Sequence, residues 1–124
     1  MALVLVIDDE PSMRRMIRRS LEGEGHTVLE AEHGRIGMKI AQQHRPEVVI
    51  TDILMPETEG IETIRSLRAS IPAVKILAIS GAGEINGVSY LRIAGALGAD
   101  DILAKPFRSD ELVSAVARLL MLER

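Results

Sequence analysis

The sequence has no cysteine and no tryptophan, and Tyr90 and Phe107 are its only aromatic residues. Disulfide bonds are therefore excluded. Acidic residues (18) outnumber lysine and arginine (15), which gives a formal net charge of −3. Surfaces that bind nucleic acid usually present a basic face or stacking rings. We therefore expect no direct nucleic acid binding by this chain.

Long apolar runs are also lacking. No stretch approaches the roughly 18 apolar residues that a membrane-spanning helix needs, and the N-terminus has no basic start followed by an apolar segment of the secretory type. We expect a soluble, cytoplasmic protein without membrane contact. With 124 residues, 47% of them hydrophobic, the chain has the length and composition of one domain with a real core, expected to span residues 1–124.

Short apolar runs alternate with longer segments of helical period. The strand candidates are residues 3–7, 27–31, 47–51, 74–80 and 101–104. Apolar side chains recur at helical spacing at Met13, Met16, Ile17 and Leu21; Ile36 and Ile40; Ile61, Ile64, Leu67 and Ile71; and Leu112, Val116, Leu119 and Leu120. A weaker helix fits residues 88–97, with Gly98 as its C-cap. This alternation predicts an α/β protein, a (βα)5 parallel sheet with helices on both faces.

Ionisable and hydroxyl side chains follow the predicted strands where the strands end. They are Asp8, Asp9 and Glu10 after the first, Asp52 after the third, Ser80 after the fourth, and Lys105 with Pro106 after the fifth. In open parallel sheets, ligands bind outside the carboxyl ends of the strands. We therefore expect this edge of the sheet to carry the chemistry.

Clustered carboxylates repel one another, and a hard divalent cation such as Mg²⁺ would offset that repulsion. Lys105 and Ser80, together with Mg²⁺, could neutralise a transferring phosphoryl group, and a carboxylate can be its nucleophile. Two simpler interpretations remain open. The acids before Pro11 are also typical of a solvated turn that leads into a helix, and Lys105 would equally form a salt bridge without any chemistry.

Four motifs in order resemble those of response-regulator receiver domains: "VIDDEP", "DILMPETEG", "AISG" and "GADDILAKPF". The resemblance covers essentially the whole chain. It implies a doubly wound, flavodoxin-like sheet of five parallel strands in the order 2-1-3-4-5. It also implies a site for Mg²⁺ and a phosphoryl group at the edge already described.

The resemblance assigns a role to each motif residue. It implies that Asp52 is the phosphoacceptor and also a metal ligand. Asp9 would bind Mg²⁺ directly, Asp8 would act largely through water, and the carbonyl of Leu54 would be a further ligand. Ser80 would be the switch hydroxyl, and Lys105 would be the cation that pairs with the phosphoryl group. It also implies a cis peptide bond between Lys105 and Pro106. No other cofactor is expected, because the glycines of "ISGAGEING" miss the dinucleotide-binding spacing by one residue.

Three positions depart from the usual receiver pattern. Glu59 replaces an aspartate, which we expect to matter little. Ser80 replaces the more frequent threonine and keeps the hydroxyl. Ile102 occupies the place of an aromatic residue three positions before the lysine. The aromatic half of the family's switch is therefore missing.

The resemblance implies a signalling switch and not an enzyme in the ordinary sense. Such a module takes a phosphoryl group from a sensor histidine kinase or a histidine phosphotransfer protein, and it catalyses its own phosphorylation and dephosphorylation. A homodimer through the face of the fourth helix, fifth strand and fifth helix is a further expectation. One alternative is an aspartyl-phosphate phosphohydrolase, although such enzymes usually place a second acid two residues after the nucleophile, whereas Asp9 follows Asp8 directly. The other is a degenerate receiver that acts as a scaffold, which the complete motif set disfavours.

The first predicted helix also carries four arginines: Arg14, Arg15, Arg18 and Arg19. They lie opposite its apolar stripe, which is typical of a solvated face. A docking surface for a kinase or phosphotransfer partner is the alternative.

Overall fold

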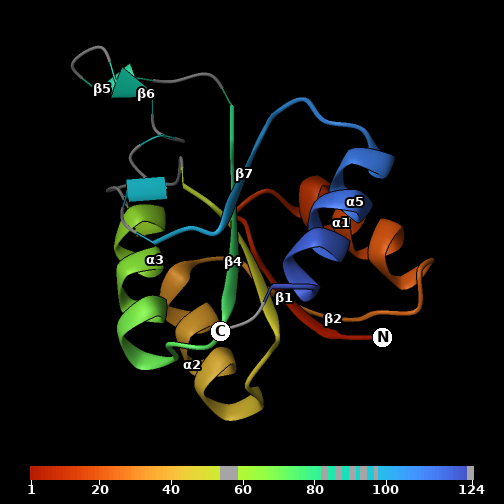
Figure 1. Ribbon diagram of the computed structural model, residues 1–124, viewed down its shortest axis with the longest axis horizontal. Helices are drawn as coiled ribbons and strands as arrows, with labels where there is room; N and C mark the ends of the chain where they lie inside the picture. The colour runs from red at the N-terminus through yellow and green to blue at the C-terminus, as the bar shows by residue number, and fades with distance from the viewer. Residues whose placement is uncertain are drawn as a thin grey trace.

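The computed structural model describes residues 1–53, 59–81, 84–85, 88–89, 92, 95–96 and 98–122. Figure 1 shows strands that run between two pairs of helices. The elements in chain order are β1 (Leu3–Ile7), α1 (Pro11–Glu22), β2 (Thr27–Ala31), α2 (Gly34–His44), β3 (Val48–Asp52), α3 (Glu59–Ser70), β4 (Lys75–Ser80), β5 (Glu84–Ile85), β6 (Val88–Ser89), β7 (Asp101–Ala104) and α5 (Ser109–Leu120). None of the helices in these ranges is long and apolar enough to cross a membrane.

Five strands form one parallel sheet in the order β2-β1-β3-β4-β7, which confirms the predicted order. The chain leaves β1 toward β2 on one side and then returns to place β3 on the other side. Such a reversal of strand order opens a crevice at the carboxyl ends of the strands. Asp52 is the last residue of β3 and pairs with Ile79, one residue before Ser80. The sheet therefore ends where the predicted site residues begin.

Each face of the sheet has its own hydrophobic core, because successive side chains of a strand point to opposite faces. On one face, Leu5 and Val49 pack with residues of α2 and α3. On the other, Val6 and Ile50 pack with residues of α1 and α5. Figure 1 shows the same division, with α2 and α3 on one side of the strands and α1 and α5 on the other. The sheet is thereby held in place from both faces.

Helix α2 packs closely against the sheet at Gly37. His33 is its N-cap, and the His33 side chain accepts a hydrogen bond from the backbone N–H of Ile36. One turn further on, a Cβ atom on Gly37 would overlap the side chain of Ile7. A residue larger than glycine at position 37 would therefore push on the last residue of β1, immediately before Asp8.

The segment after β4 differs from the prediction. Val88 and Ser89 were expected at the start of a helix, but they form β6 and pair antiparallel with β5 inside the expected loop. Of the remaining residues in the expected helix, 92, 95 and 96 are helical, and 90–91, 93–94 and 97 lie outside the described residues. The predicted start of the helix was therefore too early. Val88 is β-branched, and such residues pair readily in strands.

Arg68 fastens the end of α3 to the segment that enters β7. Its guanidinium donates to the backbone oxygens of Pro72, Val74 and Gly98. It also forms an ion pair with Asp100 at 2.8 Å. The Asp100 carboxylate in turn accepts a hydrogen bond from the backbone N–H of Ile76 at 2.8 Å. A planar donor with five N–H groups suits this cross-link between three segments of backbone.

Candidate functional site

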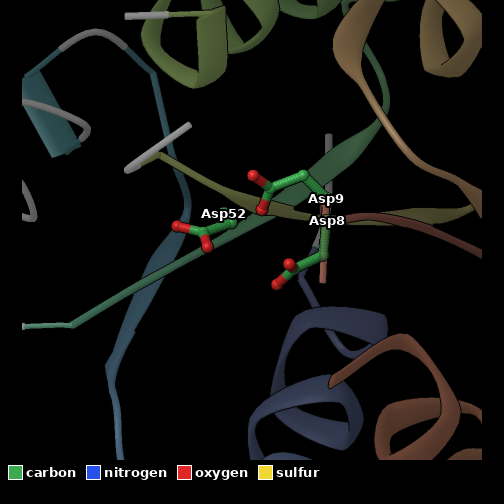
Figure 2. Close-up of side chains that lie close together, drawn as sticks. All are labelled: Asp8, Asp9 and Asp52. Atoms are coloured by element: carbon green, nitrogen blue, oxygen red, sulfur yellow. The ribbon is translucent and has the colours of Figure 1, made fainter. Parts of the chain in front are cut away.

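Three aspartates meet at the carboxyl end of the sheet. Asp8 and Asp9 follow β1, and Asp52 ends β3. One carboxylate oxygen from each lies within 4.8 Å of those of the other two. In Figure 2 the carboxylates of Asp8 and Asp9 both turn toward the side on which Asp52 lies. The acids that the sequence places far apart in the chain therefore form one cluster.

Asp8 is completely buried and held at several points. Its Oδ1 accepts a hydrogen bond from the backbone N–H of Glu10 at 2.9 Å, and its Oδ2 lies 3.3 Å from Nζ of Lys105. Burial nevertheless raises the pKa of Asp8. The hydrogen bond from Glu10 and the charge of Lys105 lower that pKa, but they do not compensate for burial and for the nearby charge of Asp52. Burial therefore disfavours the ionised form of Asp8 despite the nearby lysine.

Lys105 brings a cation to the same cluster. Its Nζ lies 2.8 Å from Oδ2 of Asp52. Burial lowers the pKa of Lys105, but the hydrogen bond and charge of Asp52, together with Asp8, outweigh burial and raise it above its ordinary value. Lys105 is therefore a fixed positive charge at neutral pH. The peptide bond between Lys105 and Pro106 is cis, which confirms the prediction.

Ser80 ends β4 and is fully buried. Its Oγ makes no hydrogen bond to any residue in the described part of the chain. A buried hydroxyl without a partner loses its interaction with water and gains nothing in return. The hydroxyl of Ser80 is therefore a buried donor that no residue in the described ranges satisfies.

Glu10 was expected at the same edge of the sheet, but its side chain does not join the acidic cluster. Glu10 turns away from the aspartates, because its Oε1 accepts a hydrogen bond from Oγ of Ser12 at 2.8 Å. Glu10 contributes its backbone N–H to Asp8 and is exposed at its side chain. Leu54, whose carbonyl was expected to bind the metal, lies outside the described residues.

The cluster has the donor chemistry that Mg²⁺ requires. Mg²⁺ prefers oxygen ligands, carboxylates and water among them. One oxygen each of Asp8, Asp9 and Asp52 lies within 4.8 Å of the other two, so these side chains bring such ligands to one place. Asp9 is the exposed member of the three, so an ion can approach from solvent. The three side chains fit the ion that the sequence implies.

Sequence reasoning missed the role of Arg14 near this site. It grouped Arg14 with three other arginines as a solvated or docking face. In the structure Arg14 donates to the backbone oxygen of Asp8 at 2.6 Å and forms an ion pair with Glu30 at 3.2 Å. Glu30 was the available signal, because a lone acid inside a predicted strand of the sheet calls for a basic partner.

The comparisons with known proteins identify the family of this chain. The response regulator receiver domain family matches residues 4–117. Response regulator MprA of Mycolicibacterium vanbaalenii is 36% identical over 118 residues, which are 94% of this chain and 49% of that protein. This chain therefore spans about half the length of the curated relatives that it matches.

Two solved structures extend the comparison. Chemotaxis response regulator CheY4 of Vibrio cholerae superposes with a TM-score of 0.84 at 30% identity, over 96% of this chain and 98% of its own. A response regulator receiver domain protein from Clostridium thermocellum gives a TM-score of 0.87 at 30% identity, over 97% and 94% of the two chains. With the family match, the acidic cluster and the strand order all in agreement, this chain belongs to the response regulator receiver domains, the switch modules of two-component signalling.

Proposed function

We propose that this chain is a phosphoacceptor module that receives a phosphoryl group on Asp52 from a phosphohistidine partner in a Mg²⁺-dependent reaction. The observation that carries the proposal is the position of Asp52 between a lysine and two further carboxylates that could hold Mg²⁺. Its Oδ2 lies 2.8 Å from Nζ of Lys105, and its carboxylate belongs to the Asp8 and Asp9 cluster. A phosphoryl group on Asp52 would need both.

The proposed phosphoryl transfer is a displacement at phosphorus. The P–N bond of the phosphohistidine breaks, and a bond forms between phosphorus and a carboxylate oxygen of Asp52. The imidazole leaves with the electron pair and takes up a proton. When bound, Mg²⁺ supplies charge neutralisation at the phosphoryl oxygens.

Side chains of this protein pair with the phosphoryl group and hold the ion. Lys105 pairs with Asp52 before transfer and is already placed to pair with phosphoryl oxygens afterwards. Ser80, buried without a partner among the described residues, donates its hydroxyl to the same group. Asp8 and Asp9 hold the ion, with Asp9 as the direct ligand and Asp8 acting largely through water. The module is a switch, and its catalysis is confined to its own phosphorylation and dephosphorylation.

The proposed partners follow from this role. The phosphoryl donor is a sensor histidine kinase or a histidine phosphotransfer protein in the cytoplasm. The binding face is assigned to the fourth helix together with β7 and α5, where Ile102 is 42% exposed and Asp101 pairs with Arg118 at 3.2 Å. That face binds the output partner or a second copy of the chain.

A phosphorylation assay tests the proposal. The chain is incubated with Mg²⁺ and acetyl phosphate, and intact mass spectrometry should show the addition of one phosphoryl group. The Asp52→Asn variant should remain unlabelled under the same conditions. Labelling of that variant to the same extent as the parent would overturn the assignment of the nucleophile.

A metal titration tests the two remaining acids. Asp9→Ala should weaken Mg²⁺ binding more than Asp8→Ala, because an octahedral ion loses more from a direct ligand than from a group that acts through water. Equal losses would contradict the division of roles between them.

A further inference from the structure

Arg14 joins three parts of the molecule next to the acidic cluster. It lies in the first turns of α1, and its side chain is only 16% exposed, against 43% for Arg18. Nη1 of Arg14 donates to the backbone oxygen of Asp8 at 2.6 Å, and Nε lies 3.2 Å from Oε1 of Glu30 on β2. One planar side chain therefore ties α1 and β2 to the residue that follows β1.

The bond from Arg14 completes the fixation of Asp8. The backbone N–H of Asp8 donates to Ala31 at 3.1 Å, which continues the pairing of β1 with β2. Glu10 and Lys105 hold its two carboxylate oxygens. The carbonyl oxygen remains, and Arg14 holds it with a short, charge-assisted hydrogen bond.

Asp9 has no comparable support of its own. It is exposed, and its carboxylate makes no hydrogen bond or ion pair with any residue of the described ranges. The carbonyl of Asp8 and the N–H of Asp9 belong to one planar peptide unit. A group that fixes that carbonyl also fixes the plane from which the Asp9 side chain projects toward Asp52.

We propose that Arg14 is a positioning residue for the metal site: by holding the peptide between Asp8 and Asp9, it directs the Asp9 carboxylate toward the ion. Glu30 keeps the guanidinium in place from β2. This inference rests on the proposed function, because it takes the cluster to be a Mg²⁺ site. Arg14 lies outside the acidic cluster and acts in addition to Ser80 and Lys105.

Electrostatic repulsion alone predicts the opposite effect on Mg²⁺ affinity, so an experiment can distinguish the two explanations. A guanidinium next to the cluster repels a divalent cation, so its removal should strengthen Mg²⁺ binding if electrostatics were its only effect. If Arg14 positions Asp9, its removal should weaken binding. Loss of a side chain that orients a metal ligand typically costs 10–100-fold in metal affinity.

The test uses three variants of the chain. Arg14→Gln removes the charge and the planar group that bonds both Asp8 and Glu30. Arg14→Lys keeps the charge but has no planar group that can hold both partners. Arg18→Gln is the matched control, because Arg18 also pairs with Glu30, at 2.6 Å, but forms no hydrogen bond or ion pair with Asp8. Mg²⁺ affinity is measured by NMR titration, and unfolding in urea shows whether each variant is folded.

We expect the Mg²⁺ affinity of Arg14→Gln to fall by about tenfold or more. The affinity of Arg14→Lys should fall as well, whereas that of Arg18→Gln should equal the affinity of the parent. A second measurement needs no metal. In Mg²⁺-free buffer, amide hydrogen exchange at Asp9 and Glu10 should be faster in Arg14→Gln than in the parent or in Arg18→Gln, beyond any change in global stability.

The outcomes separate the two proposals. A parent chain that does not bind Mg²⁺ would overturn the proposed function. A parent that binds Mg²⁺, with an Arg14→Gln variant that binds it as well or better, would overturn the positioning role alone. Unchanged exchange at Asp9 in that variant would also overturn it.

Discussion

Nζ of Lys105 lies 2.8 Å from Oδ2 of Asp52 across the carboxyl ends of β3 and β7, although 53 residues separate the two in sequence. The same ammonium group lies 3.3 Å from Asp8. Lys105 is therefore a counterion of the acidic cluster. It is also the group that a phosphoryl group on Asp52 would meet first.

Lys105→Ala should retain Mg²⁺ binding and lose phosphorylation or the response to it. The aspartates that hold the ion remain, whereas the cation that pairs with phosphoryl oxygens is gone. Labelling with acetyl phosphate and a Mg²⁺ titration on the same preparation check both halves. A Lys105→Ala protein that is labelled and switches like the parent would contradict the assigned role.

Asp8→Asn should stabilise the Mg²⁺-free protein at neutral pH. Burial raises the pKa of Asp8, so its ionised form destabilises the folded state. That cost appears as the pH rises through the ordinary aspartate pKa, and it is complete above the raised value. Urea unfolding should show the advantage of Asn shrinking toward acid.

Saturating Mg²⁺ provides the control for Asp8→Asn. An ion that binds only the folded state stabilises the parent and should stabilise the variant much less. A variant less stable than the parent at neutral pH without Mg²⁺ would argue against burial as the dominant effect on Asp8.

Glu30→Gln should destabilise the protein at neutral pH and have no effect in acid. Hydrogen bonds from Arg18 and Arg14 lower the pKa of Glu30 despite its burial, with Arg18 the larger contributor. A lowered carboxyl pKa contributes stability above the ordinary value, and this is lost as the pH falls through the lowered one. Glu22→Gln is the control in urea unfolding, because its exposed pair with Arg18 is worth little. Equal losses in the two variants at neutral pH would contradict the prediction.

Gly37→Ala should lower the free energy of unfolding by about 1–3 kcal/mol, the usual cost of overpacking a well-filled core. The added methyl group would overlap the side chain of Ile7, which is fully buried and cannot move into solvent. Gly95→Ala is the matched control, since no atom of the described residues lies within 4 Å of an added Cβ there. If both variants unfold at the same urea concentration, the close approach of α2 to β1 is not a constraint.

Ile102 should take little part in the response to phosphorylation. It is 42% exposed on β7, and a β-branched side chain is stiff at χ1 and has no ring to swing between two positions. The response should then fall mainly on residues 81–97. Hydrogen exchange with and without beryllofluoride checks this, and changes confined to residues 101–104 would refute it.

The sequence by itself determined the layout of the fold. Strands and helices alternate with distinct periods, and five such strands in one parallel sheet place Asp8, Asp52 and Lys105 at its carboxyl edge. The resemblance of the motifs to those of receiver domains then implied the strand order and the cis bond before Pro106, which the structure confirms. The alternation of strands and helices, by contrast, follows from local pattern alone.

Only the tertiary structure decided the contacts that depend on direction in space. Periodicity shows which face of α1 Arg14 occupies, but not that its guanidinium reaches the carbonyl of Asp8 and not solvent. The pairing of Val88 in β6 in place of a helix is likewise a matter of which partner strand is near. Side chains as long as arginine and segments as short as two residues have weak local preferences, so their neighbours in the folded protein decide.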